Sequence, residues 1–203
     1  MPGMENETLL DDGLRTELSA LYRAPGRHYH GLAHVEALLA LWREHRALID
    51  DPAAIEAAIW FHDAVYDSQR NDNEHLSALL AREKLAGRVP EERLERIVAM
   101  IEATATHTPP VSGDPQGFGD AALFLDMDLS ILGAPPAAFD AYEEAIRREY
   151  AWVDDATWRK GRAGVLGRFA ERPRLYLTDS FRQRFEAPAR RNIARSLARL
   201  AAD

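Results

Sequence analysis

The sequence predicts an all-α protein, and three observations support this fold class. Apolar residues recur at intervals of three and four along most of the 203 residues, as they do on the buried face of a helix. Capping residues stand at the expected ends of several such segments. No segment shows the sustained alternation of a strand, and the run RLYLTD, residues 174–179, is the one weak candidate. We therefore expect about eight helices in a single domain that covers residues 1–203.

Five helices are expected in the N-terminal half, at residues 10–21, 31–49, 51–66, 72–86 and 90–105. The third has the clearest beginning, because Asp51 can cap its N-terminus and Pro52 occupies the first helical position. Asp72 or Asn71 can cap the fourth helix, and Gly87 is placed to end it.

The segment PPVSGDPQGFG is rich in proline and glycine, and it predicts a loop at residues 109–120. We interpret this loop as an excursion within one domain, because no linker or repeat accompanies it. Four more helices are expected after it, at residues 120–133, 136–153, 155–171 and 188–203.

The composition excludes several classes of protein. No cysteine is present, which excludes disulfides and thiolate metal sites and favours a cytoplasmic location. The acidic N-terminus lacks the pattern of a secretory signal, and no apolar run is long enough to predict a membrane span. The net charge of −8 argues against general nucleic-acid binding, although a small phosphorylated substrate needs only a local basic site. A homodimer is compatible with these properties.

His62 and Asp63 are the most unusual residues of the chain, because they stand in the most apolar part of the third expected helix. A buried polar side chain is costly unless it is paired, and aspartate is rarely buried alone. Neighbouring residues on a helix point about 100° apart, so these two side chains rarely serve each other. A structural hydrogen bond to a carbonyl would explain His62, whereas a metal ion that both residues reach would explain the pair.

Two further segments contain polar residues in apolar surroundings. His34 stands beside Val35 and Leu38 in the second helix, and Asp126 and Asp128 lie within the apolar run FLDMDLSILG. The order is then a histidine, a His–Asp pair and an aspartate, each on an expected helix.

This order resembles the H…HD…D signature of the HD superfamily of metal-dependent phosphohydrolases. The resemblance is close over residues 27–133, including RHYHGLAHV and AIWFHDAVYD. It implies that a divalent metal, such as Mn, Co, Ni, Fe, Zn or Mg, is bound by His34, His62, Asp63 and Asp128. It also implies that the enzyme hydrolyses a nucleotide or another small phosphorylated metabolite with metal-activated water.

The two aspartates of LDMDL cannot both face one metal, because residues two apart on a helix point roughly 200° from each other. Asp128 lies at the edge of the apolar stripe of Leu125, Leu129 and Leu132, and the HD pattern favours the second acid of a D-x-D segment. We therefore assign Asp128 to the metal and Asp126 to a supporting or capping role.

Other residues are candidates for the chemistry. Arg27 and His30 are expected to contact the substrate, with Arg27 as the phosphate binder. Asp63, Glu74 and His107 are expected to act in catalysis, with Glu74 positioning water. The alternative is a structural role at a helix end. Glu74 would then stabilise a helix N-terminus and His107 a helix C-terminus, where their charges interact favourably with the helix dipole.

The resemblance leaves other functions open. HGLAH lacks the glutamate of a zinc-protease motif, which excludes that class. Leu129 follows Asp128, where many HD proteins have a basic residue that meets phosphate, and only His75 and His107 are available downstream for a second metal. The alternatives are a regulatory or ligand-binding HD module with a structural metal, and a di-iron HD oxygenase.

Overall fold

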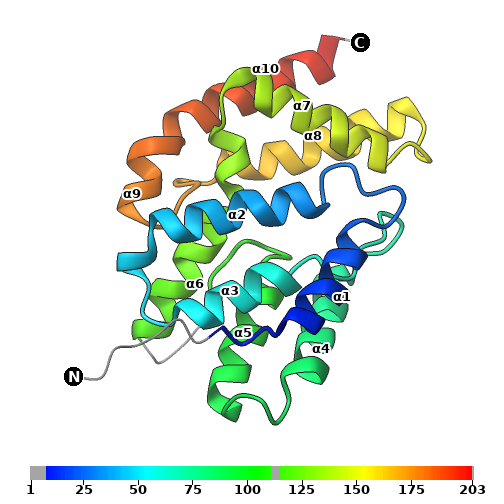
Figure 1. Ribbon diagram of the computed structural model, residues 1–203. Coiled ribbons are helices and arrows are strands. Elements are labelled where there is room, and N and C mark those ends of the chain that lie inside the picture. The colour runs from blue at the N-terminus through cyan, green and yellow to red at the C-terminus, as the bar shows by residue number, and fades with distance from the viewer. Residues whose placement is uncertain (1–7, 111–114, 203) are drawn as a thin grey trace. The chain divides into compact units, whose positions relative to one another are not determined.

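The computed structural model describes residues 8–110 and 115–202, with 115–118 described by their backbone alone. Every regular element in this part of the chain is a helix (Figure 1), which confirms the all-α prediction and is consistent with about eight helices. The weak strand candidate at 174–179 is wrong: this segment is irregular until α9 (Asp179–Phe181) begins.

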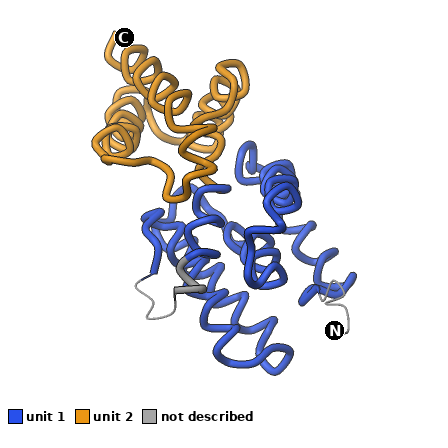
Figure 2. The backbone as a smooth tube through the Cα atoms, turned by 90° about the vertical axis from the view of Figure 1, so that its left-hand side faces the viewer, with its two compact units in different colours: residues 1–127 blue, residues 128–203 orange. Residues whose placement is uncertain are grey.

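The chain divides into two compact units, Met1–Met127 and Asp128–Asp203, coloured blue and orange in Figure 2. A single domain therefore stays a prediction, and each unit is described by itself. No single helix in the described residues is long and apolar enough to cross a membrane. One bent pair, 119–133 with 136–149, passes that test by length and composition only.

The first unit is built around one almost completely buried helix, α3 (Pro52–Phe61). Its neighbours are α1 (Asp12–Tyr22), α2 (Leu32–Glu44), α4 (Asn73–Leu85) and α5 (Glu91–Ala103), each of which contacts it. A short 3-10 turn, Arg46–Leu48, follows α2. Glu56, which pairs with Arg15 of α1, is the one charged residue of α3, and the surrounding helices enclose the rest of it and hold its two ends in place.

The beginning of α3 confirms the predicted cap. Asp51 accepts a hydrogen bond from the Ala54 amide at 3.1 Å, and Pro52 occupies the first turn. The carboxylate of Asp120 in turn accepts hydrogen bonds from the amides of Asp50 (2.9 Å) and Asp51 (2.8 Å). Arg93 of α5 also pairs with Asp51, so α3, α5 and α6 are joined at this point.

The end of α3 differs from the prediction. The expected helix through residue 66 was too long, because α3 ends at Phe61 and His62 is its C-cap. The chain leaves the helix at Asp63, and side chains from outside the helix satisfy the backbone groups that further helical turns would have paired.

The expected loop at 109–120 was also too long at its C-terminal end. Residues 111–114 lie outside the described residues, but α6 (Pro115–Asp128) begins at Pro115, a residue whose fixed φ suits the first helical position. The helix expected at 120–133 is the second part of α6 followed by a 3-10 turn, η2 (Leu129–Gly133).

The second unit consists of helices packed around the C-terminal one. They are α7 (Pro136–Glu149), α8 (Asp155–Glu171), α9, a π-helical turn at Arg182–Glu186 and α10 (Ala187–Ala202). α10 contacts both α8 and η2, and Asn192 donates hydrogen bonds to the carbonyls of Leu132 and Ala134 at 2.9 Å each.

Candidate metal centre

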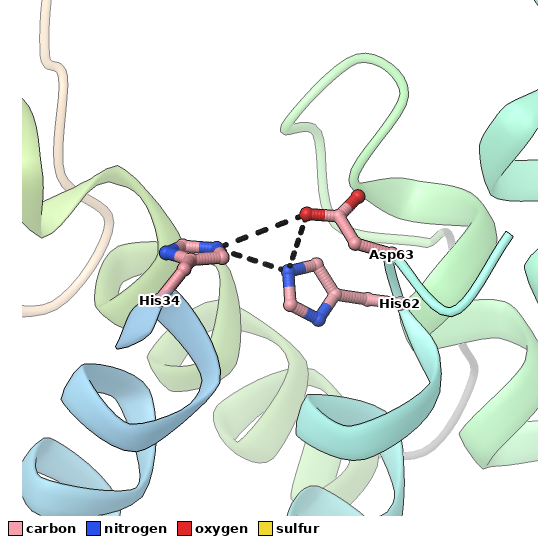
Figure 3. A group of neighbouring side chains, drawn as sticks. All are labelled: His34, His62 and Asp63. Carbon is pink, nitrogen blue, oxygen red and sulfur yellow. Dashed lines mark hydrogen bonds and ion pairs between the residues drawn. The ribbon is translucent and has the colours of Figure 1, made fainter. Parts of the chain in front are cut away.

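Three of the four predicted metal ligands converge in the first unit. His34 of α2, His62 and Asp63 are all buried, with exposed fractions of 6%, 1% and 9%. The His34 Nε2 and His62 Nε2 atoms are 3.1 Å apart, and Asp63 Oδ2 lies 3.1 Å from His62 Nε2 and 3.9 Å from His34 Nε2 (Figure 3). One ligand atom from each residue therefore lies within 4.8 Å of the other two.

The convergence of His62 and Asp63 depends on where α3 ends. Consecutive side chains within a helix point about 100° apart, so they would not share one partner. The chain turns after Phe61, with the Ala64 amide bonded to the Phe61 carbonyl at 3.0 Å. This turn lets both side chains face the same point, opposite His34.

The hydrogen bond made by Nδ1 of the His62 ring determines whether Nε2, the nitrogen that faces the centre, has a proton. Its Nδ1 lies 2.9 Å from the carbonyl oxygen of Ile59, one turn earlier in α3. A carbonyl can only accept a hydrogen bond, so this nitrogen must have a proton and donate. A neutral His62 therefore presents an unprotonated Nε2 to the centre, which is the arrangement found in histidines that bind metals.

Asp63 adds a negative charge to the centre. Burial raises the pKa of its carboxyl, but the imidazoles of His62, His30 and His34 lower it by more, so the pKa lies well below its ordinary range. The carboxyl is therefore ionised at neutral pH and can only accept hydrogen bonds. An acceptor nitrogen and an acceptor oxygen then face each other at 3.1 Å, an arrangement that requires a cation or a proton between them.

The residues fit a divalent metal. Two imidazole nitrogens and a carboxylate oxygen are a donor set that suits Zn, Fe, Mn, Co and Ni. The other solution is a proton on His62 Nε2, which would form a buried imidazolium–carboxylate pair with Asp63. A proton can be shared by only two atoms, so it would explain the pair of His62 and Asp63 but not the approach of His34. A metal ion binds three or more ligands at once and would explain all three residues.

Arg27 lies beside the centre, but its guanidinium binds protein. It donates to the backbone carbonyls of His30 (2.9 Å), Asp63 (2.6 Å) and Ala64 (2.8 Å). It also lies over the ring of Tyr22, 5.1 Å from the ring centroid. Three of its five N–H groups are thus engaged by the backbone around the centre. A contact with substrate phosphate stays a prediction.

His30 lies next to two residues of the centre, His34 and Asp63. Its ring stacks on Tyr66, with centroids 4.2 Å apart, and lies edge-on to His34 at 6.4 Å. It is half-buried and close enough to Asp63 to lower the pKa of that carboxyl. Its predicted role in substrate binding is consistent with this place.

The two other predicted catalytic residues lie at helix ends. Glu74 stands in the first turn of α4, half-buried, and its carboxylate makes no hydrogen bond or ion pair with the described residues. His107 follows α5 with a φ of 48°, a left-handed conformation that is uncommon outside glycine but enriched in histidine. Neither role is tested by this geometry, and both stay predictions.

The two aspartates of α6 differ in their surroundings. Asp126 is 1% exposed, whereas Asp128 is half-buried at the end of the helix. Asp128 is also the first residue of the second unit, so its place at the centre stays a prediction.

Sequence reasoning missed three residues that hold the turn after α3. The Tyr22 hydroxyl accepts a hydrogen bond from the Asp63 amide, while Ser77 and Asn73 of α4 bind the backbone of Val65 and Asp67. Their common signal in the sequence is weak: each is a polar side chain on the buried side of its helix.

No family model, curated protein or solved structure matches the chain. The fold and the centre define it as an all-α protein with a buried His–His–Asp cluster suited to a cation.

Proposed function

We propose that the chain is a metal-dependent phosphohydrolase of the HD type, acting on a nucleotide or another small phosphorylated metabolite. One observation supports this proposal above the others. His62 Nε2, His34 Nε2 and Asp63 Oδ2 lie within 4 Å of one another in a largely buried place, so that two imidazole nitrogens and an ionised carboxylate can share one cation. This arrangement is stable when a cation binds all three atoms.

The charge of the first unit supports a cation as the bound species. Residues 1–127 contain 22 acidic and 11 basic side chains, so this unit concentrates cations and repels phosphate unless its charge is offset. A divalent metal supplies that offset: when bound, it polarises a phosphoryl oxygen and lowers the pKa of a coordinated water.

The remaining residues of the proposed site act around the metal. His34, His62 and Asp63 would hold it, with Asp128 as the fourth ligand. Helical spacing supports Asp128, because residues four apart lie on one helix face. Phe124, four residues earlier on α6, packs edge-on against His62 with ring centroids 5.9 Å apart. His30 and His107 would bind the substrate and move protons, and Glu74 would orient the attacking water.

The proposal is tested by metal content and by a hydrolysis screen. Purified protein is stripped, reloaded separately with Mn, Co, Ni, Fe, Zn or Mg, and assayed for phosphate release from nucleotides and phosphomonoesters. We expect about one bound metal per chain and metal-dependent turnover. Asp63→Ala should abolish both while leaving the helix content unchanged, because Asp63 follows α3 and lies outside any helix.

His34→Ala should also abolish metal binding, because it removes one of the three converging ligands. Its matched control is His45→Ala, since His45 caps the other end of the same helix and its ring lies 3.0 Å from the Leu41 carbonyl oxygen. It should bind metal like the unchanged protein. Turnover that survives Asp63→Ala would refute metal-dependent hydrolysis. Two irons per chain together with oxidation of the substrate would favour the di-iron oxygenase. One tightly bound metal without turnover would favour the regulatory module.

A further inference from the structure

The backbone of Asp63 is bound on both sides by side chains from the first helix and the loop after it. The Tyr22 hydroxyl accepts a hydrogen bond from the Asp63 amide at 3.2 Å and donates one to the Trp60 carbonyl at 3.1 Å. It therefore joins the last turn of α3 to the residue that leaves it. Tyr22 is 2% exposed, so water does not compete for these bonds.

Arg27 completes the arrangement by binding the carbonyl group of Asp63. Its Nη1 group donates to the carbonyls of His30 and Asp63, and its Nη2 group donates to that of Ala64. The guanidinium carbon also lies over the rings of Tyr22 and Tyr66, at 5.1 and 5.6 Å from their centroids. Because two aromatic rings attract it, the guanidinium is held in place while it binds three carbonyls.

The residues after the turn are held independently by α4. The Ser77 hydroxyl accepts from the Val65 amide at 3.1 Å and donates to the Val65 carbonyl at 3.2 Å. The Asn73 side chain makes the same pair of bonds with Asp67, at 3.0 and 2.9 Å. The turn is therefore fixed at its far end without help from Tyr22 and Arg27. Any freedom left by their removal is concentrated at Asp63 and Ala64.

We infer that Tyr22 and Arg27, named here the Asp63 clamp, are positioning residues of the metal centre. They hold the amide and the carbonyl of Asp63 so that its carboxylate stays beside His62 Nε2. This inference rests on the proposed metal centre, and it gives Arg27 a task other than phosphate binding. A carboxylate on a free turn would have to be ordered by the metal itself, at a cost in affinity.

The inference is tested with Co²⁺ as the probe in the full chain. Tyr22→Phe removes only the bridging hydroxyl, and Arg27→Ala removes all three carbonyl contacts. The matched control is Arg23→Ala, because Arg23 lies at the end of the same helix, is exposed, and makes no side-chain hydrogen bond, ion pair or ring contact with the described residues. Co²⁺ affinity is measured by calorimetry, the ligand geometry by visible absorption, and the Asp63 amide by hydrogen exchange in metal-free protein.

Both clamp variants should weaken Co²⁺ binding by about 10- to 100-fold, the usual effect of losing a partner that orients a metal ligand. They should also shift the Co²⁺ absorption bands and speed exchange at Asp63, while the amides inside α3 keep their protection. Arg23→Ala should match the unchanged protein in all three measurements. A purely structural role would instead raise exchange throughout α3.

The clamp and the proposed function fail in different ways. Unchanged Co²⁺ affinity in both clamp variants would overturn the clamp while leaving the metal centre intact. If the unchanged protein does not bind Co²⁺, the proposed function is overturned, and so is the predicted loss of Co²⁺ affinity in the clamp variants. Exchange at Asp63 that stays slow in Tyr22→Phe and Arg27→Ala would overturn the clamp whether or not metal binds.

Discussion

Removal of the Arg162 side chain should strongly destabilise the second unit. Its Nε lies 3.1 Å from a Glu143 oxygen, its Nη2 also contacts that oxygen, and Nη2 donates to the Tyr142 hydroxyl at 2.8 Å. The exposed side-chain fractions of Arg162 and Glu143 are 7% and 12%. Burial lowers the pKa of Arg162, but Tyr142 and Glu143 raise it by more, so the side chain stays a cation.

The size of the effect follows from what Arg162→Ala leaves behind. In this variant the Glu143 carboxylate stays buried without a cation beside it. Its remaining partner is the Ser196 hydroxyl, which donates a hydrogen bond of 2.7 Å. Breaking such a buried pair from one side costs about 3–5 kcal/mol. For a chain of this length 1 kcal/mol lowers Tm by about 2–4 °C, so the variant should melt roughly 6–20 °C lower.

Urea and thermal unfolding, followed by circular dichroism, measure this loss. Lys160→Ala is the control, because Lys160 is exposed on the same helix, and it should change the free energy of unfolding by less than about 0.5 kcal/mol. Replacing both partners, with Arg162→Met and Glu143→Leu together, should recover most of the loss, since no unpaired charge stays buried. A loss in Arg162→Ala no larger than that in Lys160→Ala would refute the argument.

Two further predictions concern α6 and the turn that follows it. Asp128→Asn should lose the bound metal, whereas Asp126→Asn should keep it with weaker affinity; metal analysis after gel filtration measures both, and the reverse order would exchange their roles. Gly133→Ala should destabilise the protein by about 1–3 kcal/mol in urea unfolding, because the new Cβ would lie 2.7 Å from the Cβ and the carbonyl oxygen of Phe185. Gly161→Ala, which meets nothing within 4 Å inside α8, should instead stabilise by about 0.5–1 kcal/mol, and a loss there would contradict the packing argument.

The helices could be predicted from the sequence because their apolar period and caps are local. The Asp51 cap with Pro52, the end of α4 near Gly87 and the amphipathic α5 all follow from neighbours within a few residues. The ends of α3 and of the loop before α6 could not be predicted in this way. A helix ends where other groups satisfy its backbone, and for α3 one of those groups is Tyr22, about 40 residues away in the chain.

The centre shows the same division between local and distant causes. His34, His62 and Asp63 could be chosen as candidates because polar residues in apolar helices are costly and call for a partner. Their convergence could not be derived from helical spacing, since the spacing of an uninterrupted helix would have separated His62 from Asp63. The task of Arg27 was equally hidden, because a guanidinium that binds three carbonyls has the same sequence signature as one that binds phosphate.

The basic residues of the first unit bear on how a phosphorylated substrate would be held. Most arginine and lysine side chains within residues 8–110 pair with carboxylates, for example Arg15 with Glu56 and Arg82 with Glu95. Arg27 is engaged by backbone carbonyls. Since acidic residues also outnumber basic ones two to one in residues 1–127, little positive charge in this unit is left for phosphate. On the proposed function, the metal is therefore the main positive charge that this unit offers the substrate, and loss of Asp63 removes substrate binding together with turnover.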